Sequence, residues 1–382
     1  MTHSLFPDIR APQPARQHFP ALDGLRGVAA LAVVVFHFME MVIGNYSQLF
    51  IGHGWLAVDF FFCLSGFVIG YAYDDRIGSM GLLTFARVRL IRLHPMVVFG
   101  SVLGLIALYA DPFRATPLNL SPGQVSLIFL ASVFLIPYPA MQERSFCLFS
   151  LNSPAWSLFW EYIANIVYAL FLCRLGRRGL VVATVVAAAI LCAVGYTQGN
   201  LWAGFNGETF WVGAARVNFS FLAGLLVYRS GLLIRTRLGF TVPAVLLALA
   251  LMTPYATGGW IREAVVIMLV FPALVMIGAG VTLNERSKRF CKLAGDISYP
   301  LYTTHYAVIY AFGNYVDTRH PSATQLSLVI GGGVIGTVAF AYIVMRCYDI
   351  PLRAYLGHLM RFPEGGFATP SGRPRHRTDH SN

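Results

Sequence analysis

The stretch Leu22-Asp-Gly-Leu-Arg-Gly-Val-Ala-Ala-Leu-Ala-Val-Val-Val-Phe-His37 is an apolar run with an arginine near its start and a histidine at its end. Because an α-helix rises about 1.5 Å and turns about 100° per residue, Arg26 and His37 lie about three turns and about 16 Å apart on one helix face. Ionisable side chains inside a lipid-spanning helix are costly and usually serve a function. The stretch therefore predicts a membrane helix with a functional histidine inside it.

The composition of the 382-residue chain is that of a membrane protein. Hydrophobic residues make up 57% and charged residues 12%, whereas ordinary globular proteins contain roughly 25% charged residues. The net charge of +11 comes from short Lys and Arg clusters between apolar runs, without a nucleic-acid-binding motif, so we expect no nucleic-acid partner. The six cysteines show no CxxC pair or ligand-like spacing, so we expect no metal site. The expected fold class is an all-α, polytopic integral membrane helical bundle.

Eleven apolar runs are candidates for membrane segments. They cover residues 25–43, 54–73, 95–110, 124–137, 154–173, 180–197, 209–228, 241–257, 263–283, 297–316 and 325–345. Short cytoplasmic loops carry an excess of Lys and Arg, and this excess falls on one side only if the segment 124–137 does not cross the bilayer. Its length of about 14 residues is short for a span. We therefore predict about ten transmembrane helices, one short re-entrant or interfacial segment, and two cytoplasmic termini.

Both ends of the chain are polar. Residues 1–21 form a polar N-terminal tail, and residues 22–350 form the membrane domain. Residues 351–382 form a basic C-terminal tail with too little apolar surface to fold alone, so we expect this tail to be disordered.

Polar residues of several predicted helices fall at one depth of the bilayer. His37 lies about 9 Å below the outer end of its helix by the rise per residue, and Asp59, near the start of the returning helix, lies at a similar depth. A carboxylate beside an imidazole fixes its tautomer and raises its basicity, so we expect Asp59 to orient His37. The candidate catalytic residues are His37, Asp59 and Glu161, and the candidate substrate-binding residues are Ser157, Tyr302 and His305.

Three arginines mark the predicted cytoplasmic mouth of the bundle. Arg26 begins the first helix, and Arg89 and Arg92 precede the third. A guanidinium is permanently charged and binds two phosphate oxygens at once, and a phosphopantetheine arm has roughly the length of the step from Arg26 to His37. The three arginines are therefore candidate ligands for the phosphates of an acyl-CoA, although a nucleotide-sugar or a lipid pyrophosphate would suit them equally well.

Four stretches, in the same order along the chain, resemble the motifs of one known family. Leu22–His37 resembles its opening LDGLRG and Arg-x10-His signature, Val58–Phe67 resembles VD(L/I)FFVLSGF, Trp156–Glu161 resembles WSLxxE, and Leu293–His305 resembles LGxISYxLYLxH. Arg89-Leu-Ile-Arg92 before Pro95 also resembles the family's basic RxxRIxP turn. The chain is thus similar to the membrane acyltransferase type 3 family of bacterial and eukaryotic O-acyltransferases.

The resemblance implies transfer of an acyl group from a cytoplasmic acyl-CoA, with acetyl-CoA as the expected donor. The expected acceptor is a hydroxyl of a cell-surface or exported carbohydrate or of a lipid-linked glycan. His37 would act as general base oriented by Asp59, or would itself be acylated transiently. No permanently bound cofactor is expected, and the expected location is the inner or plasma membrane.

A second class of protein fits some of the same residues. Intramembrane His, Asp and Glu also build the proton relays of transporters, so a proton-coupled transporter or exporter of an acyl or sugar compound is the alternative. The inner-face arginines and the lack of an internal repeat favour the enzyme. A sensory or scaffold protein would leave the four ordered motifs without a purpose.

Overall fold

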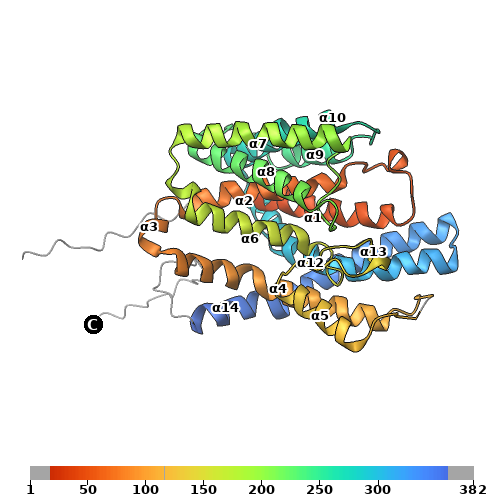
Figure 1. The fold of residues 1–382 in the computed structure, drawn as a ribbon. Coiled ribbons are helices and arrows are strands. Elements are labelled where there is room, and N and C mark those ends of the chain that lie inside the picture. Colours follow the sequence, from red (N-terminus) through yellow and green to blue (C-terminus); the bar gives the residue numbers. More distant parts are fainter. Residues whose placement is uncertain (1–17, 116, 360–382) are drawn as a thin grey trace, which may run out of the picture.

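The computed structural model describes residues 18–115 and 117–359. Every regular element within these ranges is helical, and no β-strand is present in them, which confirms the all-α fold class. The long helices run side by side along one direction, with α3 (Ile77–Met80) and α14 (Ile350–Leu359) at one end of the molecule (Figure 1). Most of the two predicted tails, residues 1–17 and 360–382, lies outside the described residues.

Eight helical segments of the described ranges are long and apolar enough to cross a membrane. They are α1 (Pro20–Glu40); α2 (Ala57–Tyr73) with the preceding turn η2 (Gly54–Leu56); α4 (Leu82–Ala110); α6 (Ala155–Leu170) with the turn η4 (Leu172–Arg174); α7 (Arg177–Gln198); α8 (Phe210–Ser230); α10 (Trp260–Val265) and α11 (Phe271–Gly280), joined by a π-turn (Val266–Val270); and α13 (Ala323–Val344), joined to α14 by a π-turn (Met345–Asp349). These segments confirm a polytopic membrane bundle. The number of ten spans and the sides of the two termini stay predictions.

Two apolar runs form short helices. α5 (Pro122–Val133) occupies the segment predicted to be re-entrant or interfacial, and it begins with a capping box between Ser121 and Gln124. α9 (Thr241–Leu251) ends six residues before its predicted end at residue 257. Pro254 explains the early end, because a proline has no backbone N–H and disfavours helical geometry in the residue before it.

Two helices extend beyond their predicted limits. α4 begins at Leu82, directly after Gly81, whose φ of 78° suits glycine. Arg89 and Arg92 therefore lie on a helix and not in a loop. At the other end of the chain, α14 makes the first part of the predicted basic tail helical. α14 packs against α4, and an ion pair joins Arg353 of α14 to Asp349 at the end of the preceding π-helical segment.

Small residues allow α1 to lie close along α12 (Glu285–Arg319), which contains the predicted span 297–316 in its later part. A Cβ added to Gly27 would lie 2.6 Å from the Cβ of Ala294, and a Cβ added to Gly295 would lie 2.6 Å from the Cβ of Asp23. Such small residues let two membrane helices approach along their backbones. The close fit sets the rotation of α1, and with it the directions of Arg26 and His37.

α2 and α8 cross equally closely. A Cβ on Gly66 would overlap the Phe221 carbonyl, and a Cβ on Gly224 would overlap the Cys63 carbonyl. The absence of side chains at both glycines brings the two backbones together. This crossing places the face of α2 that carries Asp59 directly against α8.

Candidate active site

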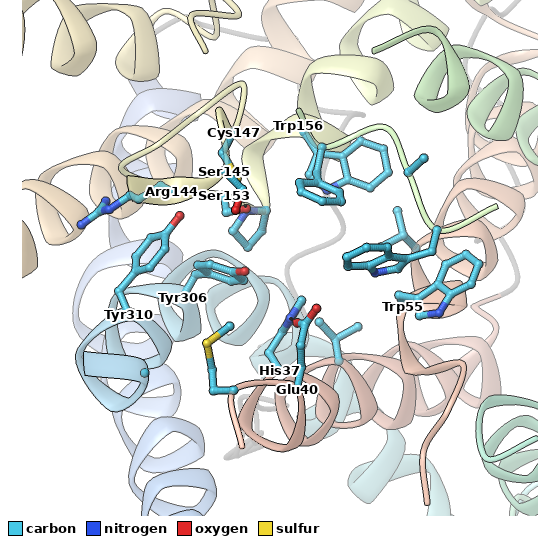
Figure 2. A pocket seen from close by; sticks show the side chains of 18 of the residues that line it. His37, Glu40, Trp55, Arg144, Ser145, Cys147, Ser153, Trp156, Tyr306 and Tyr310 are labelled. Atoms are coloured by element: carbon cyan, nitrogen blue, oxygen red, sulfur yellow. Dashed lines mark hydrogen bonds and ion pairs between the residues drawn. The ribbon is translucent and has the colours of Figure 1, made fainter. Parts of the chain in front are cut away.

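Two cavities inside the bundle meet at Val58 and Tyr302, whose side chains line both. The larger, of about 780 Å³, is called the arginine cavity; its lining includes Arg26, Arg89, Arg92, Ser157, Glu161 and Lys292. The smaller, of about 430 Å³, is called the aromatic cavity; its lining includes His37, Glu40, Trp55, Trp156, Trp202 and Tyr306 (Figure 2). With Tyr302, six of the nine site residues predicted from the sequence line the arginine cavity, so residues far apart in the chain do converge.

His37 lies on the wall of the aromatic cavity, near the end of α1 (Figure 2). Its Nδ1 is 2.7 Å from Oε2 of Glu40, and the other Glu40 oxygen accepts a hydrogen bond of 2.6 Å from the Tyr46 hydroxyl. An ionised carboxylate can only accept, so Nδ1 carries the hydrogen in this contact. Glu40 was not among the site residues predicted from the sequence, although its spacing of three residues from His37 puts the two on one helix face.

Asp59 does not contact His37, and the prediction that it orients the imidazole is wrong. Asp59 is fully buried and pairs with Arg216 of α8: Oδ2 is 2.6 Å from Nη2, and Oδ1 is 3.2 Å from Nε. Arg216 also donates to the Ala203 carbonyl at 2.7 Å. The prediction used only the depth of Asp59 in the membrane, which does not fix the rotation of its helix. Because α2 crosses α8 closely, the carboxylate points toward Arg216 of α8 and not toward α1. An arginine inside the apolar run 209–228 was the signal that a buried carboxylate partner exists.

Arg216 is held by aromatic rings as well as by charge. The rings of Trp55 and Trp156 each lie with their centroids 5.2 Å from its guanidinium carbon. Both tryptophans and Arg216 line the aromatic cavity. A cation over aromatic faces gains electrostatic attraction when it is removed from water, so this cluster forms one rigid wall of the cavity.

His305 packs against the ring of His37. The two ring centroids are 5.5 Å apart and the planes are inclined by 24°. His305 is fully buried, its Nδ1 bonds the Leu301 carbonyl at 3.1 Å, and its Nε2 has no hydrogen-bond partner among the described residues. The structure therefore brings His305 to His37 but buries it beneath the cavity wall.

Tyr302 separates the two cavities. Its hydroxyl lies 2.7 Å from the Ser157 hydroxyl, so that α12 and α6 are joined at this point. Tyr302 and Ser157 were both predicted to bind substrate, and both line the arginine cavity. Tyr302 therefore lies at the boundary that the two cavities share.

Glu161 lies in the arginine cavity, whereas His37 lines the aromatic one. One oxygen of Glu161 is 2.8 Å from Nη2 of Arg89 and accepts a hydrogen bond of 3.1 Å from Ser65. The two residues predicted as catalytic carboxylate and phosphate ligand thus form an ion pair with each other. The structure does not bring Glu161 to His37.

The arginine cavity is lined by more cationic side chains than the three arginines predicted from the sequence. Arg26 is engaged by α12, because its Nη2 donates to the Gly295 carbonyl at 2.8 Å and its Nε to Ser298 at 2.9 Å. Arg92 makes no ion pair with a described residue. Lys292 and Arg353 line the same cavity, and neither was among the candidate phosphate ligands predicted from the sequence.

Comparisons with known proteins identify the family of the chain. A family model described as an acyltransferase domain matches residues 19–346. "Protein 2 in picA locus" from Rhizobium radiobacter is 35% identical over 189 residues, which cover 47% of this chain and 93% of that protein. "Acyltransferase MdmB" from Streptomyces mycarofaciens is 24% identical over 368 residues, which cover 84% of this chain and 90% of that protein. No solved structure matches the chain.

The family match spans nearly the whole chain, from just before α1 to the short π-helix after α13. It includes all four motifs found in the sequence and most of the residues that line the two cavities. The chain therefore belongs to the membrane acyltransferase type 3 family, and it is a multi-pass membrane acyltransferase.

Proposed function

We propose that the protein is an O-acyltransferase that takes its acyl group from an acyl-CoA in the arginine cavity and transfers it to a hydroxyl compound in the aromatic cavity. The meeting of the two cavities at Val58 and Tyr302, with His37 on the aromatic side, carries this proposal. A donor and an acceptor that enter from opposite sides would meet beside a histidine. Bringing two reactants and a base together is a major source of rate enhancement in group transfer.

The arginine cavity suits a donor with a charged head and a long arm. Arg92, Lys292 and Arg353 line it, and cationic side chains bind phosphate oxygens, with arginine able to bind two at once. Apolar side chains of α2, among them Phe61 and Val68, also line it and would cover a pantetheine chain. We infer that the CoA phosphates bind the cations while the thioester reaches Tyr302.

The chemical step needs one base and no net uptake of protons. Nε2 of His37 takes the proton of the acceptor hydroxyl while the hydroxyl oxygen attacks the thioester carbonyl; the carbon–sulfur bond then breaks, and the proton passes from His37 to the CoA thiolate. In the competing route Nε2 itself attacks the thioester, and the acceptor takes the acyl group from His37 in a second step. Cys147 also lines the aromatic cavity, but burial raises the pKa of its thiol and keeps it a poor nucleophile.

The aromatic cavity suits a ring-shaped acceptor that carries hydroxyl groups. Trp202 and Tyr306 present aromatic rings to it, and Glu40 and Ser153 present polar groups. Aromatic faces bind the apolar face of a ring, while convergent polar groups fix its orientation. We therefore propose a carbohydrate acceptor and a short acyl group such as acetyl. We also propose that the protein lies in the inner or plasma membrane and that its arginine cavity opens toward the cytoplasm, as the bias of Lys and Arg favours.

The test uses purified protein in detergent, where no gradient exists. We expect the wild type to consume acetyl-CoA and release free thiol when an acceptor carbohydrate is present, and His37→Asn to lower that rate by about 10² to 10⁴-fold. His320→Asn is the matched control, because His320 is exposed at the end of α12 with a φ of 45° that asparagine tolerates. Wild-type activity in His37→Asn would refute both chemical routes, and the absence of thiol release from the wild type would favour the transporter.

Trapping the intermediate separates the two routes. In a single turnover with labelled acetyl-CoA and no acceptor, the general-base route leaves no label on the protein. Label on the wild type that is absent from His37→Asn would instead establish the acyl-histidine route.

A further inference from the structure

Glu40 is the carboxylate that contacts His37, and its position in α1 is unusual. It is the last residue of the helix, where the negative end of the helix dipole disfavours a second negative charge. Two donors offset this cost, one for each oxygen: Nδ1 of His37 at 2.7 Å and the Tyr46 hydroxyl at 2.6 Å. The side chains of Glu40 and His37 are only 14% and 19% exposed. The contact is therefore largely protected from water, which would weaken it.

Tyr46 connects this pair to the loops beside the aromatic cavity. It lies in the short turn η1 (Tyr46–Gln48), and its ring centroid is 5.0 Å from that of Trp202 and 5.7 Å from that of Tyr255. Burial and the adjacent Glu40 carboxylate raise the pKa of the Tyr46 phenol, so the hydroxyl keeps its proton and donates a hydrogen bond to Glu40. The loops before α8 and before α10 thereby support the position of Glu40.

We propose that Glu40 is the positioning residue for His37 and that Tyr46 holds the Glu40 carboxylate in place. This inference rests on the proposed function, in which Nε2 of His37 is the base. A carboxylate that accepts from Nδ1 keeps the hydrogen on that nitrogen, fixes the ring, and leaves a lone pair on Nε2. It also stabilises the imidazolium that forms when Nε2 takes the proton of the acceptor. Nε2 makes no hydrogen bond to a described residue, so it is free to accept that proton.

Substitution of Glu40 and Tyr46 tests their role in the chemical step. We expect Glu40→Ala to lower kcat by about 10²-fold, because His37 loses both its orientation and the stabilisation of its charge. Glu40→Gln should lie between Glu40→Ala and the wild type, since its amide oxygen still accepts from Nδ1 but carries no charge. Tyr46→Phe, which leaves Glu40 in place, should lower kcat by a few-fold. The KM for acetyl-CoA should stay within about twofold of the wild type in all three, because these residues do not line the arginine cavity.

Glu208→Gln is the matched control. Glu208 is an exposed carboxylate of the loop before α8, and its amide variant should keep wild-type kcat and thermal stability. Should Glu40→Ala fail to fold, the kinetic test is made with Glu40→Gln and Tyr46→Phe.

A tautomer measurement separates positioning from a merely structural role. In ¹⁵N NMR spectra of histidine-labelled protein, the His37 signals are those lost in His37→Asn. We expect the Nδ1–H form in the wild type and in Glu40→Gln, whose amide oxygen still accepts from Nδ1, and a shift toward Nε2–H in Glu40→Ala. Wild-type kcat in the Glu40 variants, or a His37 tautomer that does not respond to Glu40→Ala, would overturn the proposal. Activity retained in His37→Asn would instead overturn the proposed function, while the tautomer result would still decide whether Glu40 orients His37.

Discussion

At the scale of single residues, the buried ion pair of Asp59 and Arg216 is expected to be important for stability. The two side chains are 0% and 2% exposed, and each oxygen of Asp59 accepts from the guanidinium. We expect Asp59→Asn to lower the free energy of unfolding in detergent by about 3–5 kcal/mol, because it leaves a buried cation without its counter-charge. Asp59→Asn/Arg216→Gln should be less destabilised than either single variant. A single variant as stable as the wild type in thermal unfolding would contradict this account of the pair.

At the scale of elements, the contact of α1 with α12 holds the site in register. We expect Gly27→Leu to lower stability by about 1–3 kcal/mol, and to reduce acyl transfer as well, because its side chain would push α1 away from Ala294 and shift both Arg26 and His37. Gly331→Leu on α13 is the control: nothing lies within 4 Å of a Cβ at that position. Thermal unfolding and thiol release measure the two effects, and equal behaviour of the two variants would show that close packing of α1 is unimportant.

The elements also show which predictions from sequence succeed. The apolar runs identified most of the long helices. The ends of helices were harder to place: α4 begins well before its apolar part, since Arg89 and Arg92 sit on a helix that continues into the membrane segment. Hydropathy records where lipid contact ends, and not where helical hydrogen bonding ends.

At the scale of the whole molecule, the two cavities predict that donor and acceptor enter from opposite sides of the membrane. His18, before α1, and Arg353, on α14, both line the arginine cavity, so the two ends of the described chain contribute to the same cavity. With the six native cysteines replaced, we expect Lys292→Cys to react with a membrane-impermeant maleimide only after cells are permeabilised. Glu208→Cys, in the exposed loop before α8, should react in intact cells. Slower labelling of Lys292→Cys in the presence of CoA would support the donor site, and the reverse sidedness would contradict the predicted topology.

The sequence by itself determined that the protein is a helical membrane bundle, and its four ordered motifs identified the acyltransferase family. The first conclusion follows from composition and apolar periodicity, and the second from the resemblance of the motifs, which are all properties of the chain alone. Only the tertiary structure decided that Asp59 pairs with Arg216, that Glu40 contacts His37, and that Arg89 pairs with Glu161. Periodicity tells which residues share a helix face, but the partner of that face is set by how neighbouring helices rotate and pack.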